Sequence, residues 1–264
     1  MRIRSDSPYI RGYNSITEMN GNYKSALMDF GLFLLESGDK IVNEEPLERA
    51  YLLMKGSVIF NYNGKSIKAE RSNPFNVSCV CLHIPKGVKV EIICTSKQAE
   101  LVYQATTNNN EFEPVFYSSE DVASEMRGKG TMGDTSTRNV RTIFDNSNAP
   151  YANLVLGEVI DYPGKWSSYP PHHHPQPEIY FYKFNPVNGY GFCELGEDVV
   201  KVRENDAVLI PAGATHPQTT APGYAMLYVW VIRHLENDRY ITPTFVEEHT
   251  WVNDSNAKIW GSEK

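Results

Sequence analysis

The sequence predicts an all-β protein made of two β barrels in one chain, and three observations carry that prediction. Short segments rich in Val, Ile, Tyr and Phe recur along the 264 residues and are bounded by Gly, Pro, Asn or Asp, the pattern of strands separated by turns. Many short strands of this kind indicate a β sandwich or barrel. Only one stretch is typical of a helix, and two sequence patterns of the first half recur in the second, one of them about 126 residues further on.

Eight strands carry the signal most clearly. They are expected at residues 50–54, 57–62, 77–84 and 88–94 in the first half, and at 154–160, 179–184, 207–210 and 225–232 in the second. The helix is expected over Ser119–Met126, with Ser118 or Ser119 as its N-cap and acidic residues in its first turn.

The recurring patterns divide the chain into two domains. Leu82–Gly87 resembles Val208–Gly213, and Glu48–Gly56 resembles Glu178–Phe184, so Glu48 is the expected counterpart of Glu178. We expect one domain at residues 1–126, a polar connecting segment at 127–150 and a second domain at 151–264.

The two expected domains differ where chemistry would lie. Histidines of the second half have their mirror positions near Val42, Glu44 and Val90 in the first half, and none of these is a histidine. The first domain is therefore expected to have no metal site. We expect it to serve as scaffold and to provide the surface for a homo-oligomer, either a dimer or a larger assembly.

Composition excludes several classes of partner. The net charge is −7 and no cluster of Lys or Arg appears, so nucleic acid is not expected. The longest apolar run, Ala225–Ile232, is too short for a membrane span and the first residues do not resemble a signal peptide. We expect a cytoplasmic protein without membrane contact. Its four cysteines, in apolar segments, are expected to be buried and reduced: Cys79, Cys81, Cys94 and Cys193.

Three histidines and one glutamate form a two-part pattern in the second half. The first part is H-x-H-x3-E, from His172 and His174 to Glu178, and the second is P-x-G-x2-H, ending at His216. In an extended segment His172 and His174 share a face while His173 points the other way. The turn at Pro211–Ala214 can bring His216 back towards them.

This donor set predicts one divalent metal ion per chain. Three imidazoles and a carboxylate suit Zn(II), ranked first, or Mn(II), Fe(II), Co(II) or Ni(II), with positions left for water or a substrate oxygen. A closed structural zinc site would be expected to use cysteine.

These segments resemble the cupin superfamily, and more narrowly the 5-deoxy-glucuronate isomerase family of myo-inositol catabolism. The most specific match is the run W-S-S-Y-P-P-H-x-H, residues 166–174; other matching segments are Arg127–Lys129, Arg138–Ile143, Gly157–Ile160, Pro186–Phe192 and Trp251–Asp254. The resemblance is strong in the second half and architectural in the first. It implies a bicupin, two double-stranded β-helix barrels in one chain, with His172, His174, Glu178 and His216 holding the metal.

The resemblance also implies an activity. The expected reaction is metal-dependent aldose–ketose isomerisation of a deoxyuronic acid through an enediol, in which the metal stabilises the developing oxyanion and a base moves the proton. The loop Pro175-Gln176-Pro177 is also similar to the 5-keto-4-deoxyuronate isomerases of pectin breakdown. A cupin dioxygenase and a non-enzymatic sugar-binding cupin remain alternatives.

Further residues are expected around the metal. Tyr180 and Tyr228 have the strand parity to line the pocket and shuttle or orient protons, although both also suit core packing. Glu178 could alternatively act as the base. Arg141 or Arg233, with Arg138 as a further choice, could bind the uronate carboxylate through a bidentate fork.

Overall fold

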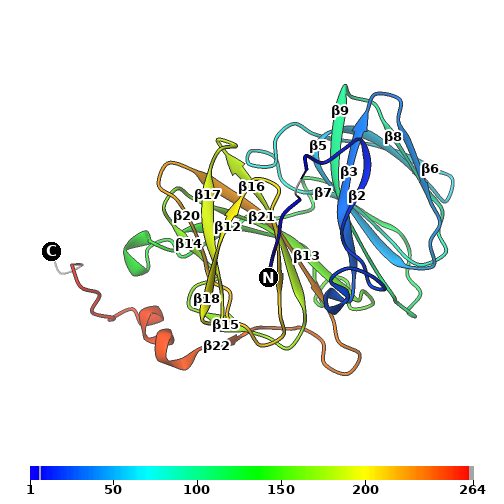
Figure 1. Cartoon of the computed structure of the whole chain (residues 1–264). Coiled ribbons are helices and arrows are strands. Elements are labelled where there is room, and N and C mark those ends of the chain that lie inside the picture. Colours follow the sequence, from blue (N-terminus) through cyan, green and yellow to red (C-terminus); the bar gives the residue numbers. More distant parts are fainter. Residues whose placement is uncertain (6, 262–264) are drawn as a thin grey trace. The chain divides into compact units, whose positions relative to one another are not determined.

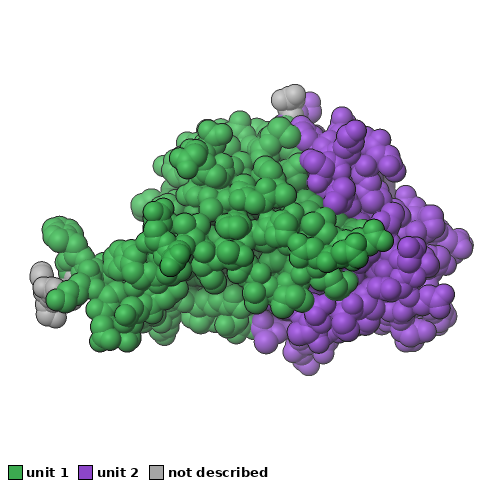
Figure 2. Space-filling model, turned by 90° about the horizontal axis from the view of Figure 1, so that it is seen from below, with its two compact units in different colours: residues 1–4, 124–141, 157–264 green, residues 5–123, 142–156 purple. Residues whose placement is uncertain are grey.

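The computed structural model describes residues 1–5 and 7–261, and these form two compact units whose regular secondary structure is mostly antiparallel β-strand (Figure 1). Unit 1 contains residues 1–4, 124–141 and 157–264, and unit 2 contains residues 5–123 and 142–156 (Figure 2). The all-β prediction is confirmed.

Unit 2 is built on a nine-stranded sheet with the order β10-β7-β5-β9-β3-β2, to which β4, β6 and β8 are joined. Its elements are β2 (Gly12–Thr17), η1 (Lys24–Ala26), β3 (Asp29–Glu36), β4 (Lys40–Asn43), β5 (Glu48–Tyr62), β6 (Lys65–Arg71), β7 (Val80–Ile84), β8 (Val90–Cys94), β9 (Gln98–Thr106) and β10 (Val115–Tyr117).

Two of the expected strands are one strand in the structure. Residues 50–54 and 57–62 both belong to β5, which pairs with β7 and β9 in its first half and with β6 and β8 in its second. A register shift between Leu53 and Lys55 marks a bulge. Gly56 follows it with φ 101°, and an added Cβ would lie 2.4 Å from the Gln98 carbonyl oxygen, so glycine is required where the strand bends.

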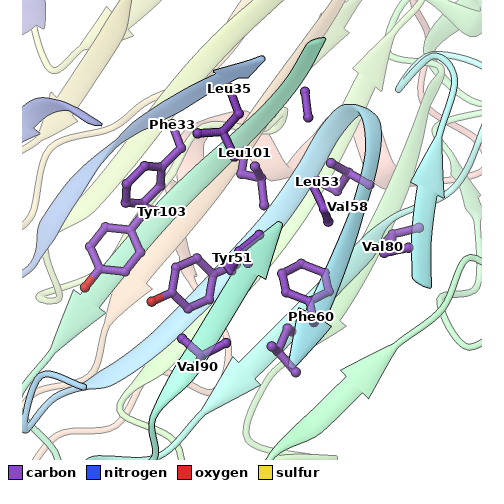
Figure 3. Packing of buried hydrophobic residues seen from close by; sticks show 14 of the residues in the cluster. Phe33, Leu35, Tyr51, Leu53, Val58, Phe60, Val80, Val90, Leu101 and Tyr103 are labelled. Atoms are coloured by element: carbon purple, nitrogen blue, oxygen red, sulfur yellow. The ribbon is translucent and has the colours of Figure 1, made fainter. Parts of the chain in front are cut away.

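The core of unit 2 consists of alternate residues on strands that face one another. Tyr51 and Leu53 of β5, Leu101 of β9 and Phe33 of β3 lie in one buried cluster (Figure 3). Alternation places one face of each strand inside and the other outside. The interior of unit 2 is therefore aliphatic and aromatic.

Glu48 does not have the place of Glu178, contrary to the expectation. Because Tyr51 and Leu53 face the interior, the even-numbered Glu48 faces the other way. The register agrees, since Arg49 pairs with Ile84 as Glu178 pairs with Ile210. The counterpart of Glu178 is therefore Arg49, whose buried guanidinium donates to the Asn43 side chain.

Unit 1 contains a seven-stranded sheet, β1-β19-β16-β21-β13-β12-β11, a four-stranded sheet, β14-β20-β17-β18, and the pair β15-β22. Its elements are β1 (Arg2–Ile3), β11 (Glu125–Arg127), η2 (Met132–Asp134), β12 (Arg138–Phe144), β13 (Leu154–Asp161), β14 (Trp166–Ser167), β15 (His172–His173), β16 (Glu178–Asn185), β17 (Tyr190–Leu195), β18 (Asp198–Arg203), β19 (Ala207–Ile210), β20 (Gln218–Thr220), β21 (Ala225–Arg233), β22 (Thr244–Phe245) and η3 (Glu247–Asn253). The boundary between the units falls within β12 and β13.

One expectation for the middle of the chain is wrong. Residues 119–126 do not form a helix, because the Asp121 carboxylate accepts hydrogen bonds from the Ser118 amide and hydroxyl and stabilises a turn. The residues that follow form β11, in which Glu125 pairs with Val140. The expected connecting segment, residues 127–150, contains β12, whose Val140 packs in the core of unit 1.

All four cysteines are buried and reduced, as predicted.

Candidate metal centre

Local structure brings the two parts of the histidine motif together. Glu178 begins β16 and pairs with Ile210, the last residue of β19. The chain then turns at Pro211, and the Gly213 amide donates to the His174 carbonyl at 2.9 Å. This backbone hydrogen bond fixes the turn against the first motif, and His216 follows three residues later.

Three side chains converge in the interior of unit 1. Nε2 of His174 lies 3.1 Å from Oε2 of Glu178, and Nε2 of His216 lies 3.4 Å from the same oxygen. The ligand atoms of all three residues lie within 4.8 Å of one another, and all three side chains are buried. A group of this size can surround a single metal ion.

Backbone carbonyls decide which ring nitrogen of each histidine faces inward. Nδ1 of His174 lies 3.0 Å from the Gln176 carbonyl oxygen, and Nδ1 of His216 lies 2.9 Å from that of Ala214. Each Nδ1 therefore carries the proton that it donates, and each Nε2 presents a lone pair when its ring is neutral. Metal-binding histidines in proteins are commonly held in this way. Nε2 of His174 is also at hydrogen-bond distance from Glu178.

These lone pairs need a cation between them. Nε2 of His216 is buried without a hydrogen-bond partner among the described residues, and it faces a carboxylate oxygen that is itself an acceptor. Acceptors facing one another in a buried site repel unless a proton or a metal ion lies between them. The donor set of His174, Glu178 and His216 therefore fits a divalent metal.

Burial also keeps two of the imidazoles neutral. Loss of solvent lowers the pKa of His172 and of His216 to about 4. For His174, burial is the largest single influence and lowers the pKa, but the hydrogen bond and charge of Glu178 and the hydrogen bond to the Gln176 carbonyl together outweigh it, so the pKa is raised. Neutral imidazole is the form that binds metal, so His172 and His216 are prepared to bind near neutral pH.

His172 lies beside the group of three without belonging to it. Its ring centroid is 4.7 Å from that of His216, and its Nδ1 lies 3.3 Å from the Pro170 carbonyl oxygen. The group whose ligand atoms lie within 4.8 Å of one another comprises the other three residues. His173 is half-buried and next to His172 in β15, which pairs with β22.

Both predicted tyrosines line the interior next to the site. The Tyr180 ring lies 5.9 Å from the His216 ring and 4.7 Å from the Tyr228 ring. Tyr228 shares a hydrogen bond with the Ser167 hydroxyl at 2.6 Å. Burial raises the pKa of both phenols, so both are protonated near neutral pH.

The two arginines expected to bind substrate are not brought to the site. Val140 faces the interior, so Arg141 next to it faces the other side of β12, where its guanidinium lies 3.4 Å from the Glu158 carboxylate. Arg233 has the parity opposite to Tyr228 on β21 and donates to the His234 carbonyl oxygen.

Arg138 is the arginine whose charge acts on the site. It has the interior parity of Val140 on β12, and its charge lowers the pKa of His172. Its Nη1 donates to the Ser136 carbonyl and hydroxyl oxygens, both at 2.8 Å.

The chain after β21 supplies two aromatic contacts that sequence reasoning missed. The Tyr240 ring lies 5.0 Å from the His174 ring, and the Phe245 ring lies 5.6 Å from the His172 ring. Asp238 holds this segment in place, because its carbonyl oxygen accepts a hydrogen bond from the Gln176 side chain at 2.7 Å. Nothing in the sequence signals that residues so far from the motif return to it.

The strand architecture and the buried histidine–glutamate group together define an all-β protein of the cupin fold. A family model described as the KduI/IolB family matches residues 5–252, and the chain belongs to that family. The resemblance read from the sequence is thereby confirmed.

Curated relatives are 5-deoxy-glucuronate isomerases. The one from Geobacillus kaustophilus is 31% identical over 165 residues, which cover 54% of this chain and 55% of the relative. The one from Listeria innocua is 25% identical over 244 residues, which cover 84% of this chain and 86% of the relative. The chain thus spans about half the length of the first of these relatives.

Solved structures share the fold. An IolB-like protein from Salmonella typhimurium LT2 has a TM-score of 0.83 at 23% identity, covering 95% of this chain and 98% of that one. Bacillus subtilis oxalate decarboxylase, described with Mn(II) centres, has a TM-score of 0.62 at 10% identity, covering 91% and 77%. Among the residues described in the present structure, no helix is both long and apolar enough to cross a membrane.

Proposed function

We propose that this protein is a metal-dependent aldose–ketose isomerase that acts on a deoxyuronic acid, specifically 5-deoxy-glucuronate. The observation that carries the proposal is the buried group of His174, Glu178 and His216, with its imidazole Nε2 atoms turned towards a shared carboxylate oxygen. Membership of the KduI/IolB family and the activity named for the curated relatives support this choice of substrate.

One divalent metal ion would be held by His174, Glu178 and His216, with His172 as a neighbouring donor. Zinc is our first choice because nitrogen and carboxylate ligands with an open position suit catalytic zinc; manganese, iron, cobalt and nickel fit the same donors. When bound, such an ion supplies Lewis-acid stabilisation of the negative charge that develops on the substrate oxygens.

The protein side chains would bind and orient the substrate around this centre. Tyr180 and Tyr228 are protonated and can donate hydrogen bonds to substrate oxygens, while a carboxylate such as Glu178 can move a proton between neighbouring carbons. Arg138 is our choice for the uronate carboxylate, because its charge reaches His172 from the interior face of β12. Arg141 is engaged with Glu158 instead.

We infer that the two units are related barrels, a bicupin, with the metal in unit 1 alone. Support comes from register: β5 pairs with β7 at Arg49 and Ile84 as β16 pairs with β19 at Glu178 and Ile210. In unit 2 the corresponding position holds a cation of the protein's own, since Arg49 donates to Asn43 Oδ1 at 2.6 Å and to the Pro85 carbonyl oxygen at 3.0 Å. A buried guanidinium there disfavours a metal ion by charge repulsion.

Turnover of 5-deoxy-glucuronate under argon in deuterated water tests the proposal. We expect conversion to the ketose without oxygen and with solvent deuterium in the product, because an enediol route exchanges the transferred proton. Elemental analysis of the same sample should find about one divalent metal per chain.

The controls separate the alternatives. His173→Ala should turn over as the wild type does, and His216→Ala should lose metal and activity together. Strict oxygen dependence would favour a dioxygenase, and turnover only of 5-keto-4-deoxyuronate would replace the substrate. Tight binding of either uronate without turnover would favour a sugar-binding protein.

A further inference from the structure

Asp161 is a carboxyl group inside unit 1 that the proposed function does not use. It is the last residue of β13, two positions after Val159, which packs in the same interior cluster as Tyr180 and Tyr228. Because alternate residues of a strand share a face, the side chain of Asp161 has the interior parity. The residue is fully buried.

No donor among the described residues lies within full hydrogen-bond distance of either oxygen of this carboxyl group, and the Ser167 hydroxyl is a neighbouring donor that acts on it. A charged carboxylate in that setting is strongly disfavoured, and the group takes up a proton instead. Burial raises the pKa of Asp161 well above its ordinary value, although the charge of Arg138 and the nearby Ser167 hydroxyl act in the opposite direction. Asp161 is therefore a buried carboxylic acid.

Glu48 is a buried carboxylate with a structural role in the same chain, and it provides a comparison for Asp161. It is equally buried, yet its Oε1 accepts from His83 at 3.0 Å and from the Leu154 amide at 3.2 Å. Its Oε2 accepts from Asn108 at 2.6 Å and from the Asn153 amide at 2.7 Å. The fold places four donors at hydrogen-bond distance from Glu48, whereas Asp161 has the neighbouring Ser167 hydroxyl and no donor at full hydrogen-bond distance among the described residues, so packing alone does not explain Asp161.

Two hydroxyl groups connect Asp161 with the tyrosines beside the metal centre. Ser167 lies close enough to influence the pKa of Asp161, and its hydroxyl shares a 2.6 Å hydrogen bond with Tyr228. The Tyr228 ring packs 4.7 Å from Tyr180, which in turn packs against His216. Asp161, Ser167 and Tyr228 thus form a series of groups with exchangeable protons. The series leads from the barrel interior towards the site.

We propose that Asp161 is a positioning residue that stores a proton for the unit 1 site and acts through Ser167 and Tyr228. This inference rests on the proposed isomerisation, in which the carbonyl oxygen gains a proton as the enediol forms and the neighbouring hydroxyl loses one as the ketose forms. Tyr228 gives its proton to the first oxygen, Ser167 replaces it, and Asp161 replaces that of Ser167. The reverse transfer from the second oxygen restores all three groups, so protons and electrons balance over the cycle.

Asp161→Asn is the direct test, because it keeps the shape and removes the transferable proton. With metal content and KM near wild type, kcat for 5-deoxy-glucuronate should fall by about 10²–10⁴, the usual contribution of a positioned proton-transfer group. Ser167→Ala should cause a similar loss, and the double variant should lose little more, because both act in one series.

Glu158→Gln is the matched control, a buried carboxylate on the other face of the same strand, paired with Arg141. It should lower the melting temperature and leave kcat of the folded, metal-loaded enzyme unchanged. Asp161→Leu should instead raise the melting temperature by about 2–4 °C, because an unpaired buried polar group is removed.

The outcomes separate this inference from the proposed function. If wild type converts 5-deoxy-glucuronate and Asp161→Asn keeps kcat within about twofold, the proton-store role is wrong and the isomerase remains. If wild type converts no uronate, the proposed function fails, and infrared spectroscopy decides the state of Asp161. A protonated-carboxyl band that disappears in Asp161→Asn supports the buried acid, and absence of that band in wild type overturns it.

Discussion

Replacing Glu48 by Gln should destabilise the protein strongly even though Glu48 lies far from the histidine motif in the sequence. The carboxylate oxygens each accept two hydrogen bonds, one pair from His83 and the Leu154 amide, the other from Asn108 and the Asn153 amide. Whichever oxygen becomes an amide nitrogen, two buried donors lose their acceptor. Each such loss costs about 1–3 kcal/mol, so the free energy of unfolding should fall by about 2–6 kcal/mol.

Thermal unfolding followed by calorimetry measures this effect. For a chain of this size each kcal/mol lowers the melting temperature by about 2–4 °C. Glu70→Gln is the control, because that side chain is 65% exposed and its ion pair with Lys68 is at the surface. A Glu48→Gln variant with the same melting temperature as the Glu70→Gln control would refute the reasoning. Metal content of the folded fraction should stay at the wild-type value, because Glu48 and the four groups that donate hydrogen bonds to it belong to unit 2, whereas the metal ligands belong to unit 1.

Three further predictions concern the site and the core. His216→Ala should lose most of the bound metal by elemental analysis, whereas His173→Ala should keep it, because only His216 belongs to the group of ligand atoms; equal metal content in both would contradict the assignment. Arg138→Met should raise KM for the uronate while leaving the fold intact, whereas Arg141→Met should cost about 3–5 kcal/mol of stability in denaturant unfolding, because it removes the cation that pairs with the buried Glu158 carboxylate; the reverse pattern of effects would make Arg141 the substrate-binding arginine. Burial raises the pKa of Cys193 to about 12, so iodoacetamide at neutral pH should leave native Cys193 unmodified and alkylate it only after unfolding, as peptide mass spectrometry can show; rapid labelling of the native protein would disprove its burial.

Most of the metal centre could be predicted because its determinants are local. The spacing from His174 to Glu178 is four residues, and the turn that begins at Pro211 follows a strand paired with Glu178 itself. Strand periodicity and turn chemistry operate over such short distances whatever the rest of the fold does. The same periodicity placed Tyr180 and Tyr228 on the interior face, where the structure has them.

Errors arose where burial depends on residues distant in the sequence. Ser119–Met126 carries helix signals, but pairing of Glu125 with Val140 favours a strand there. Glu48 resembles Glu178 in its neighbouring residues, yet a shift of one position gives its place in the register to Arg49. A one-residue shift exchanges the two faces of a strand, so sequence similarity alone could not decide which residue faces the interior.

The sequence by itself determined the all-β class, the metal-binding pattern and the family resemblance, because composition, alternation and motif spacing are properties of neighbouring residues. Only the tertiary structure decided which arginine is near the site and which buried carboxyl group lacks donors at full hydrogen-bond distance. Arg138 and Arg141 are three residues apart and chemically identical, and they differ only in which face of β12 they occupy. Asp161 and Glu48 are both fully buried carboxyl groups, and the fold places different neighbours around each of them, because hydrogen-bond satisfaction in a core depends on chain segments that meet only after folding.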